Sequence, residues 1–361
     1  MFRPSALLFA LTALPGVVCA QLLNPPPEAP APAAAAPTAP AAPAPADEEQ
    51  VFTLFRHDLI NLLALRADAH LLVAAAQIAA PDEKDPTRLA AKKTPALLKR
   101  ALQAGPQDPL VLWVAASNPC VSKPGCANPA AAKTLQSIDA DNVAVWLFSY
   151  PGDSNAEKSR AIIARMAQAQ RYDDYWAADV VALFHALETL PVPDEVRQRG
   201  VGASAARVNF ATSTASVILP QALSRLGKFC IGADPKDGAL VSDCVAVARK
   251  LETGGTFISQ GIGFEIEEAL LAPGVDRDVM QTRKRAGTWQ KEKFLQLSSR
   301  FARDPELTQS YLRLLGSEQN ELAAVSVLLH EQNIASDPPR DWQPPQAPKP
   351  PDPLSAPAAQ P

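Results

Sequence analysis

The chain has 361 residues and a formal net charge of −4, and it contains 36 prolines but few aromatic residues. Because this mildly acidic chain has no cluster of lysine or arginine, its charge argues against nucleic acid as a partner. After the N-terminal leader, no stretch reaches the roughly 18 consecutive apolar residues that a membrane-spanning helix requires, so we expect no transmembrane segment.

Residues 1–20 have the three parts of a secretory signal peptide. Arg3 supplies the positive start, residues 7–14 form a short apolar core, and Val18-Cys19-Ala20 is typical of a cleavage site. We therefore expect a mature chain that is periplasmic or secreted. Lipid attachment through Cys19 is the alternative, but a small residue is expected before an acylated cysteine, and Val18 stands there.

Two segments rich in proline flank the remaining chain: a Pro/Ala-rich linker over residues 21–47 and a Pro-rich tail over residues 337–361. Such segments bury too little large apolar surface to offset the entropy of ordering, so we expect disordered spacers. A Pro-x-x-Pro ligand, such as Pro345 to Pro348, is the sharper alternative for the tail.

Two similar stretches lie 33 residues apart in the first half of the chain, since 141 minus 108 is 33. Asp108-Pro-Leu-Val-Leu-Trp113 and Asp141-Asn-Val-Ala-Val-Trp146 each combine a polar turn with the start of an apolar helix that carries a tryptophan. Asp68 opens a related run. Residues 48–191 are therefore predicted to form an irregular series of helical hairpins, an α-solenoid-like repeat region.

Local signals in this region predict where individual helices begin. Thr94 followed by Pro95 fits an N-cap with a first-turn proline. Ser154 with Glu157 fits a capping box. The segment from Arg171 to Trp176 is expected to open the next helix.

Pro191 and Pro193 mark a boundary, after which residues 192–336 form a predicted C-terminal helical region, the bundle portion of the fold. Helices are expected over residues 207–219, 238–251, 257–271, 276–301 and 317–334, with Gly287 as a candidate break in the longest. Because no stretch alternates apolar and polar residues with the composition typical of strands, we predict an all-α protein.

The stretch from Ser137 to Leu147, followed by Gly152 and Ala156, resembles a tetratricopeptide repeat, and the resemblance covers about residues 102–190. It implies a helical solenoid that binds a protein or peptide on its concave face. It also implies that Trp146 packs between paired helices and that Ala156 lets them approach closely. The first helix is shorter than in the family pattern, and the resemblance names no ligand.

Four cysteines remain after the signal peptide: Cys120, Cys126, Cys230 and Cys244. An even number in an exported chain favours two disulfides. Three pairings exist, and we favour the local ones, Cys120 with Cys126 and Cys230 with Cys244. A four-cysteine zinc site is the alternative, although zinc fingers prefer shorter spacers.

No motif points to catalysis, a cofactor or a metal. His185 and Glu188 would share a helix face, as metal ligands can, but that face is apolar. Ser154 lacks the sharp turn of a serine nucleophile, and capping explains it. The turn at Asp139, Asp141 and Asn142 lacks the other positions of a calcium loop.

The best candidate for an interaction surface is the cluster Arg171, Tyr172, Tyr175 and Trp176, since arginine and aromatic residues dominate protein interfaces. The alternative is that the aromatic rings fill the space between helices.

These observations favour an exported, non-enzymatic helical-repeat protein that serves as a protein-binding or scaffold module in the bacterial cell envelope. The alternative is an exported hydrolase or peptidoglycan-acting enzyme on an all-α fold, using carboxylates such as Glu265, Glu267 and Glu268. A secreted effector or toxin component is a third hypothesis.

Overall fold

The computed structural model describes residues 48–80, 89–117, 128–194, 203–218 and 221–344, all of which belong to the unit Ala46–Pro361. These residues form helices joined by short connections and contain no strand, which confirms the predicted all-α class. The helices are α1 (Glu48–Leu63), α2 (Ala69–Ile78), α3 (Leu89–Ala104), α4 (Pro109–Ala116), α5 (Pro129–Ile138), α6 (Val143–Trp146), α7 (Ala156–Gln168), α8 (Trp176–Leu187), α10 (Ala203–Ser216), α11 (Gln221–Ile231), α12 (Gly238–Glu252), α13 (Phe257–Leu270), α14 (Val275–Ser298), α15 (Pro305–Glu318) and α16 (Glu321–Glu331).

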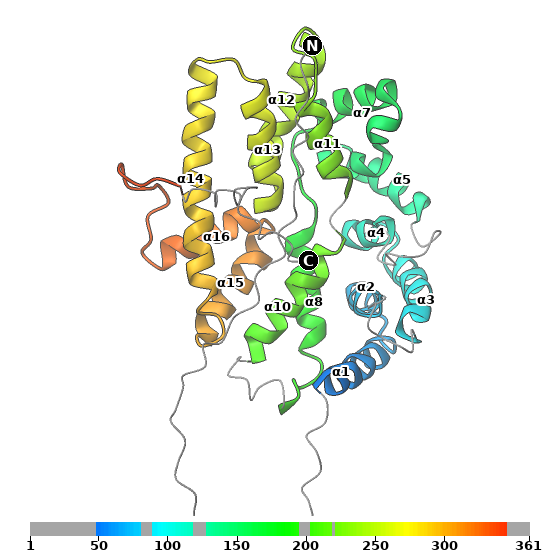
Figure 1. Ribbon diagram of the computed structural model, residues 1–361. Coiled ribbons are helices and arrows are strands. Elements are labelled where there is room, and N and C mark those ends of the chain that lie inside the picture. Colours follow the sequence, from blue (N-terminus) through cyan, green and yellow to red (C-terminus); the bar gives the residue numbers. More distant parts are fainter. Residues whose placement is uncertain (1–47, 81–88, 118–127, 195–202, 219–220, 345–361) are drawn as a thin grey trace, which may run out of the picture. The chain divides into compact units, whose positions relative to one another are not determined.

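The helices from α1 to α6 pack mainly against their neighbours in sequence (Figure 1), whereas α7 packs mainly against α12. Polar turns open two of the most apolar among them, as predicted: Asp68 accepts a hydrogen bond from the amide of Leu71 at the start of α2, and Asp108 does so from Val111 at the start of α4. Almost every side chain of α2 and α4 is buried, so these two helices form the centre of this half of the core.

Three local predictions in this region are wrong. Thr94 does not cap a helix, because α3 begins at Leu89 and the buried Thr94 hydroxyl donates to the carbonyl of Ala76 at 3.2 Å. Asn155, not Ser154, caps α7 by accepting from the amide of Lys158. Ala156 is exposed and does not mediate a close helix approach.

The two predicted tryptophan helices differ in length. α4 is a two-turn helix in which Trp113 is fully buried, with ring centroids 4.9 Å from Phe148 and 5.4 Å from Tyr175. α6 has a single turn and continues as a 3-10 turn, Leu147–Ser149. Trp146 is nevertheless buried, because Arg165 of α7 lies over its ring at 4.8 Å. Both tryptophans therefore stabilise the packing of this region.

α8 connects the two predicted halves of the chain. It packs against α2 on one side and against α10 and α15 on another. Its sequence is apolar around nearly the whole circumference, and most of its side chains are buried. Ala178, Val181 and His185 lie on the face that the neighbouring helices leave at least partly exposed. Since helices from both sides of Pro191 contact α8, packing continues across the predicted boundary. The contacts of α2 with α8 and of α7 with α12 also depart from a one-dimensional stack of repeats.

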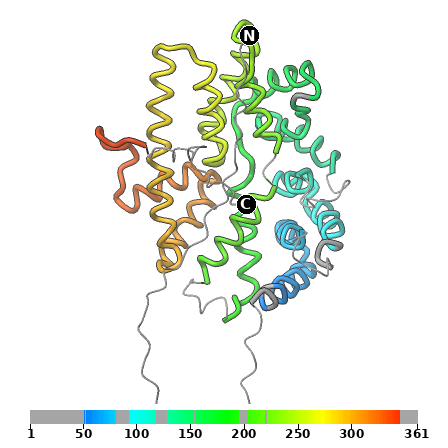
Figure 2. The backbone as a smooth tube through the Cα atoms, viewed as in Figure 1, coloured from blue at the N-terminus to red at the C-terminus, as the bar shows by residue number. Residues whose placement is uncertain are grey.

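The C-terminal helices form antiparallel neighbours around α12, α13 and α14. α12 packs on α13, and α13 lies beside α14, as the backbone trace makes clear (Figure 2). α14 runs without a break through Gly287, where an added Cβ would lie 2.8 Å from the amide oxygen of Gln260. The sulfur atoms of Cys230 on α11 and Cys244 on α12 lie 2.06 Å apart, at disulfide distance.

The first residues of the Pro-rich tail differ from the predicted spacer. Trp289 of α14 donates from its indole nitrogen to the carbonyl of Ala335 at 2.8 Å, and Trp342 packs edge-on against Trp289. The segment therefore leaves α16 and returns along α14, so the spacer predicted from residue 337 has contacts up to residue 342. Among the described helices, none combines the length and the apolar character needed to cross a membrane.

Candidate functional site

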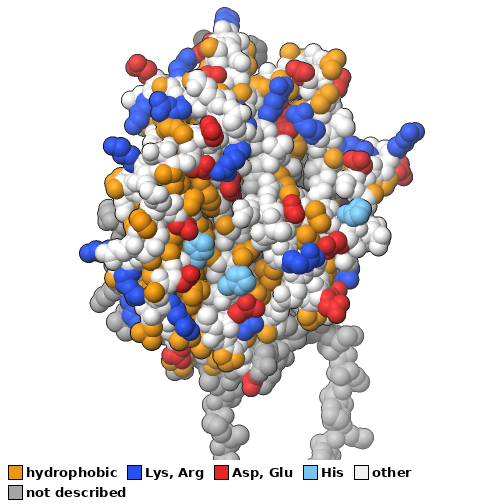
Figure 3. Space-filling view, turned by 180° about the vertical axis from the view of Figure 1, so that it is seen from behind, with side chains coloured by type: hydrophobic (Ala, Val, Ile, Leu, Met, Phe, Trp, Pro, Cys, Tyr) orange, Lys and Arg blue, Asp and Glu red, His pale blue; other side chains and the backbone are white. Residues whose placement is uncertain are grey.

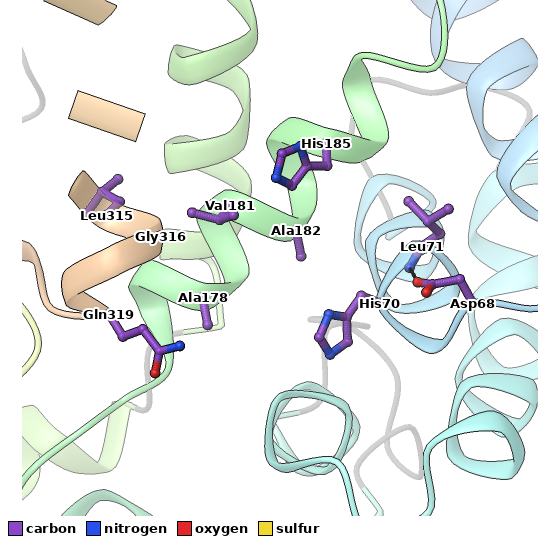
Figure 4. A pocket seen from close by; sticks show the side chains of 10 residues that line it. All are labelled: Asp68, His70, Leu71, Ala178, Val181, Ala182, His185, Leu315, Gly316 and Gln319. Carbon is purple, nitrogen blue, oxygen red and sulfur yellow. Dashed lines mark hydrogen bonds between the residues drawn. The ribbon is translucent and has the colours of Figure 1, made fainter. Parts of the chain in front are cut away.

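A groove lies between α2, α8 and the C-terminal end of α15. It consists of two adjoining hollows of about 410 Å³ and about 350 Å³, which share His70, Ala178 and Gln319 in their walls. We call the two hollows together the α8 groove. Figure 4 shows α8 running through the first hollow, with His70 on the α2 side and Gln319 on the α15 side.

Small apolar side chains of α8 form the floor of the first hollow. Val181 and Ala182 follow Ala178 by three and four residues, so both lie on the same face of the helix as Ala178. Leu315 and Gly316 of α15 extend this apolar surface. The floor offers apolar contact area without a bulky side chain that would fill the groove.

The wall opposite α15 is built from the polar turns that open the repeat helices. Asp68 and His70 come from the start of α2, and Asp108 comes from the start of α4. The His70 Nε2 atom lies 2.8 Å from the Asp108 Oδ2 atom. This hydrogen bond raises the pKa of His70 and lowers the pKa of Asp108. The turns that the sequence marks as helix starts thus converge on one surface.

A second polar cluster closes the other hollow. Arg171 forms ion pairs with Asp139 at 2.7 Å and with Asp173 at 3.1 Å. Tyr175, whose backbone is left-handed with φ 54°, donates its hydroxyl to Asp139. Burial raises the pKa of both Asp173 and the Tyr175 hydroxyl. The buried Asn142 fixes this cluster, because its side chain accepts from the Asp173 amide and donates to the Asp173 carbonyl.

The four residues of the predicted interaction surface separate into two pairs. Arg171 and Tyr175 line the α8 groove. Tyr172 and Trp176 are buried and face the interior, in line with the alternative that these aromatic rings fill the space between helices. The Tyr172 hydroxyl donates to Asp174, and the Cβ of a residue at Gly254 would lie 2.5 Å from the Tyr172 ring. These two side chains position the segment but are not available to a ligand.

The groove is rich in carboxylates. The lining side chains include four aspartates against a single arginine, Arg171, together with two histidines. The aspartates are Asp68, Asp108, Asp139 and Asp173. Viewed from behind, the molecule has a gathering of hydrophobic side chains next to histidine and acidic side chains (Figure 3). The field of such a surface favours cationic groups.

The carboxylates proposed for hydrolysis do not line the α8 groove. Glu265 is exposed on α13. Glu267 is fully buried and accepts from Arg249 at 2.9 Å and from Arg283 at 2.6 Å. Glu268 pairs with Lys284. The ion pairs that occupy Glu267 and Glu268 give these groups a structural role on α13.

Other sequence candidates have local roles. His185 contacts Glu188 at 3.2 Å at the exposed end of α8, and His185 also borders the α8 groove. Ser154 donates its hydroxyl to the carbonyl of Pro151. Cys120 and Cys126 lie outside the described residues. In the described part of the chain, no three His, Cys, Asp or Glu side chains are grouped as metal ligands.

Sequence reasoning missed the His70–Asp108 pair and the role of Asn142. His70 stands two residues after the Asp68 cap, and Asp108 is itself a cap. Both residues therefore stand at the start of a predicted helix, and this common feature could have indicated the pair. Only packing of α2 beside α4 brings them together. It also missed the buried pair Glu252 and Glu267, which Arg283 bridges.

Comparisons with protein-family models, curated proteins and solved structures find no match to this chain. The tetratricopeptide resemblance therefore stays a prediction.

Proposed function

We propose that this chain is an exported, non-enzymatic module that holds a segment of a partner protein in the α8 groove. The observation that carries the proposal is an apolar floor, formed by Ala178, Val181 and Ala182, beside a polar wall from the starts of α2 and α4 and the polar cluster around Arg171. A concave apolar surface with a few placed polar groups is the usual form of a binding site.

The chemistry of the lining favours binding over catalysis. The described residues that border the two hollows include no Ser, Thr, Cys or Lys that could act as a nucleophile. The polar groups are engaged with one another: His70 with Asp108, and Arg171 with Asp139 and Asp173. Such mutual pairing keeps the walls fixed, and a preformed site loses less conformational entropy when a ligand binds.

The excess of aspartates over arginine supports a cationic ligand. We expect a segment of a partner protein that carries lysine or arginine near the Asp68 and Asp108 side of the groove and small apolar side chains over α8. Because these charges are partly exposed, binding should weaken as the salt concentration rises.

A groove-filling variant tests this proposal. Ala178→Trp would place a large ring in the part shared by both hollows, and Ala269→Trp, at an exposed position of α13, is the matched control. The probes are immobilised peptides rich in Lys and Ala, with Glu/Ala peptides of equal length for comparison. Wild type and the Ala269 variant should prefer the basic peptides, and Ala178→Trp should bind them at least tenfold more weakly.

Circular dichroism must first establish that both variants are folded. If Ala178→Trp binds the basic peptides as tightly as wild type, or if acidic and basic peptides bind equally, the α8 groove is not the binding site. Asp108→Asn provides an independent measurement, because it removes one carboxylate without filling the groove. We expect it to reduce the salt dependence of binding.

Export is proposed from the signal-like residues 1–20 and is supported by the Cys230–Cys244 pair, since disulfides persist mainly outside the cytosol. Intact-mass measurement of the chain recovered from the cell envelope tests it. We expect a mature chain that begins at Gln21, in a periplasmic or secreted fraction. A full-length chain in the cytosol would contradict export, and an added lipid mass on Cys19 would identify the lipoprotein alternative.

A further inference from the structure

The tail segment Ala335–Trp342 lies along α14 and is held mainly through its backbone carbonyl groups. Trp289 donates to the Ala335 carbonyl at 2.8 Å, and Gln290 donates to the Ser336 carbonyl at 3.2 Å. The Arg285 guanidinium donates to the carbonyls of Pro339, Arg340 and Trp342. α14 therefore presents an ordered set of donors that matches an extended segment.

The surface of α14 that receives this segment consists of side chains at successive turns of one helix face. Arg285, Trp289 and Lys293 are each four residues apart. Lys293 lies 4.2 Å from the centroid of the Trp289 ring. On the tail, the Trp342 ring packs edge-on against Trp289 at 5.4 Å, and Arg285 lies 5.6 Å from the Trp342 centroid. We call Arg285, Trp289, Gln290 and Lys293 the α14 surface.

This arrangement has the chemistry of a receptor for Pro-rich segments. A carbonyl group is present at every residue, so the donors of the α14 surface would accept many sequences with the right backbone shape. Proline fixes an extended backbone in advance and so reduces the entropy lost on binding. Specificity would come from the aromatic ring, which packs against Trp289.

The tail segment lies on the surface of α14 and is only slightly buried. Pro339, Arg340 and Asp341 are exposed, and the Trp342 ring is only partly buried. Trp289, by contrast, is 9% exposed, and the tail supplies part of that cover. An occupant held by a few surface contacts can be exchanged for another segment that makes the same contacts.

We propose that the α14 surface is a binding site for a Pro-rich partner segment that carries an aromatic side chain, and that the chain's own tail occupies it as an intramolecular competitor. A segment tethered by a short connection acts at an effective concentration in the millimolar range. A partner peptide therefore binds the intact chain weakly until the tail is displaced or released. This proposal does not depend on the α8 groove.

The experiment uses the full-length chain and a fluorescent peptide with the sequence of residues 335–344. Trp342→Ala weakens the intramolecular occupant but leaves the α14 surface intact. Fluorescence anisotropy should give roughly 10- to 100-fold tighter peptide binding to Trp342→Ala than to wild type, given a millimolar effective concentration of the tail.

Matched variants in the Trp342→Ala background locate the bound peptide. Arg285→Met removes the donor to three carbonyls and should weaken peptide binding at least tenfold. Lys291→Met, two residues from Trp289 and hence on another side of α14, should leave binding unchanged. A peptide in which alanine replaces the residue equivalent to Trp342 should also bind at least tenfold more weakly.

Three outcomes would overturn the proposal. The first is no peptide binding to Trp342→Ala at millimolar concentration while its circular dichroism is that of wild type. The second is equal binding to wild type and Trp342→Ala. The third is binding that Arg285→Met leaves unchanged. In each case the contact between the tail and α14 has only a structural role. The result expected from that role is a loss of thermal stability in Trp342→Ala without peptide binding.

Discussion

Some buried side chains of this protein carry polar groups that form hydrogen bonds with one specific partner. Asp179 of α8 is fully buried and accepts a hydrogen bond from the Gln77 side-chain amide at 2.6 Å. Burial raises the pKa of Asp179 to about 7. The second carboxylate oxygen of Asp179 has no hydrogen-bond partner among the described residues, so a negative charge on this buried group would be poorly compensated. The pair is thus most stable when the acid is neutral.

Asp179→Asn should remove part of the pH dependence of stability. In the unfolded chain Asp179 ionises near its ordinary pKa of 3.8, whereas in the folded chain it keeps its proton until about pH 7. Wild type therefore loses up to about 4 kcal/mol of stability from this group as the pH rises from about 4 to about 7. Asparagine mimics the neutral acid, so urea unfolding at pH 5 and pH 8 should show a smaller difference in the variant. Equal differences would contradict the assignment.

Asn142 is a second residue with a structural role, because its side chain connects two segments of the chain. It caps α6 by accepting from the amide of Ala144, and it bonds both backbone groups of Asp173. Removing a buried group of this kind leaves several donors and acceptors without partners, which costs more than the loss of one hydrogen bond.

Asn142→Ala should therefore lower the free energy of unfolding by roughly 2–4 kcal/mol. Asn155→Ala is the control, because Asn155 caps α7 at an exposed position and its loss should cost about 1 kcal/mol. Urea denaturation of both variants measures the comparison. If the two losses are equal, Asn142 acts only as a helix cap.

At the scale of elements, the connection between α12 and α13 determines how the segment before α8 packs. Gly254 and Gly255 lie against Tyr172 and Asp174, with no room for a side chain between them. The Gly255 carbonyl also accepts from the Glu321 amide at the start of α16. Three distant segments therefore meet at one turn, and this junction holds one wall of the α8 groove in place.

Gly255→Ala should destabilise the fold, because its Cβ would lie 2.6 Å from the Asp174 carboxylate. Overpacking of this kind costs about 1–3 kcal/mol. Gly261→Ala is the control within α13, where no atom lies within 4 Å of an added Cβ, and it should stabilise the helix by roughly 0.5–1 kcal/mol. Thermal melting gives both values. A neutral Gly255→Ala would mean that the turn can shift without consequence.

At the scale of the whole molecule, several buried acids favour the protonated form. Burial raises the pKa of Asp174 and Glu321 to about 7. Burial, together with the hydrogen bond that the protonated Glu252 carboxyl donates to Glu267, raises the pKa of Glu252 to about 8. The His70 pKa is also raised, by its hydrogen bond to Asp108. Each of these groups holds a proton more firmly in the folded chain than in the unfolded chain.

The free energy of unfolding should accordingly fall as the pH rises from about 5 to about 8. Below about pH 4, acids with lowered pKa such as Asp108 and Glu268 act in the opposite direction and stability falls again. Urea unfolding across this range should place the maximum near pH 5. A maximum at pH 8 would show that the buried acids stay ionised in the folded protein.

Cysteine pairing is a further property of the whole chain. The predicted cleavage after Ala20 would remove Cys19 and leave four of the five cysteines. We expect no free thiol in the denatured, unreduced mature protein and four after reduction. The Cys230–Cys244 bond closes a 14-residue separation, for which the chain-entropy model gives roughly 3 kcal/mol. Two free thiols before reduction would indicate that Cys120 and Cys126 do not form the predicted bond.

Local sequence patterns are enough to predict the all-α class and many of the helix starts. Local interactions explain this, because a cap such as Asp68 or Asp108 bonds an amide three residues away and acts whatever packs around it. The predicted span of the longest helix, 276–301, is close to that of α14, Val275–Ser298, but the candidate break at Gly287 is wrong. Where two local signals competed, as at Thr94 or Ser154, the sequence pattern selected the wrong position.

Which polar residues meet depends on how the helices pack against one another. His70 and Asp108 are 38 residues apart, and only the packing of α2 and α4 against each other joins them. The same holds for Arg171 with Asp139, for the Gly255 junction and for the tail on α14. Side-chain periodicity identifies the buried face of a helix but not the helix that covers it, because many apolar faces are equally able to pack. The α8 groove exists because of which helices pack next to one another.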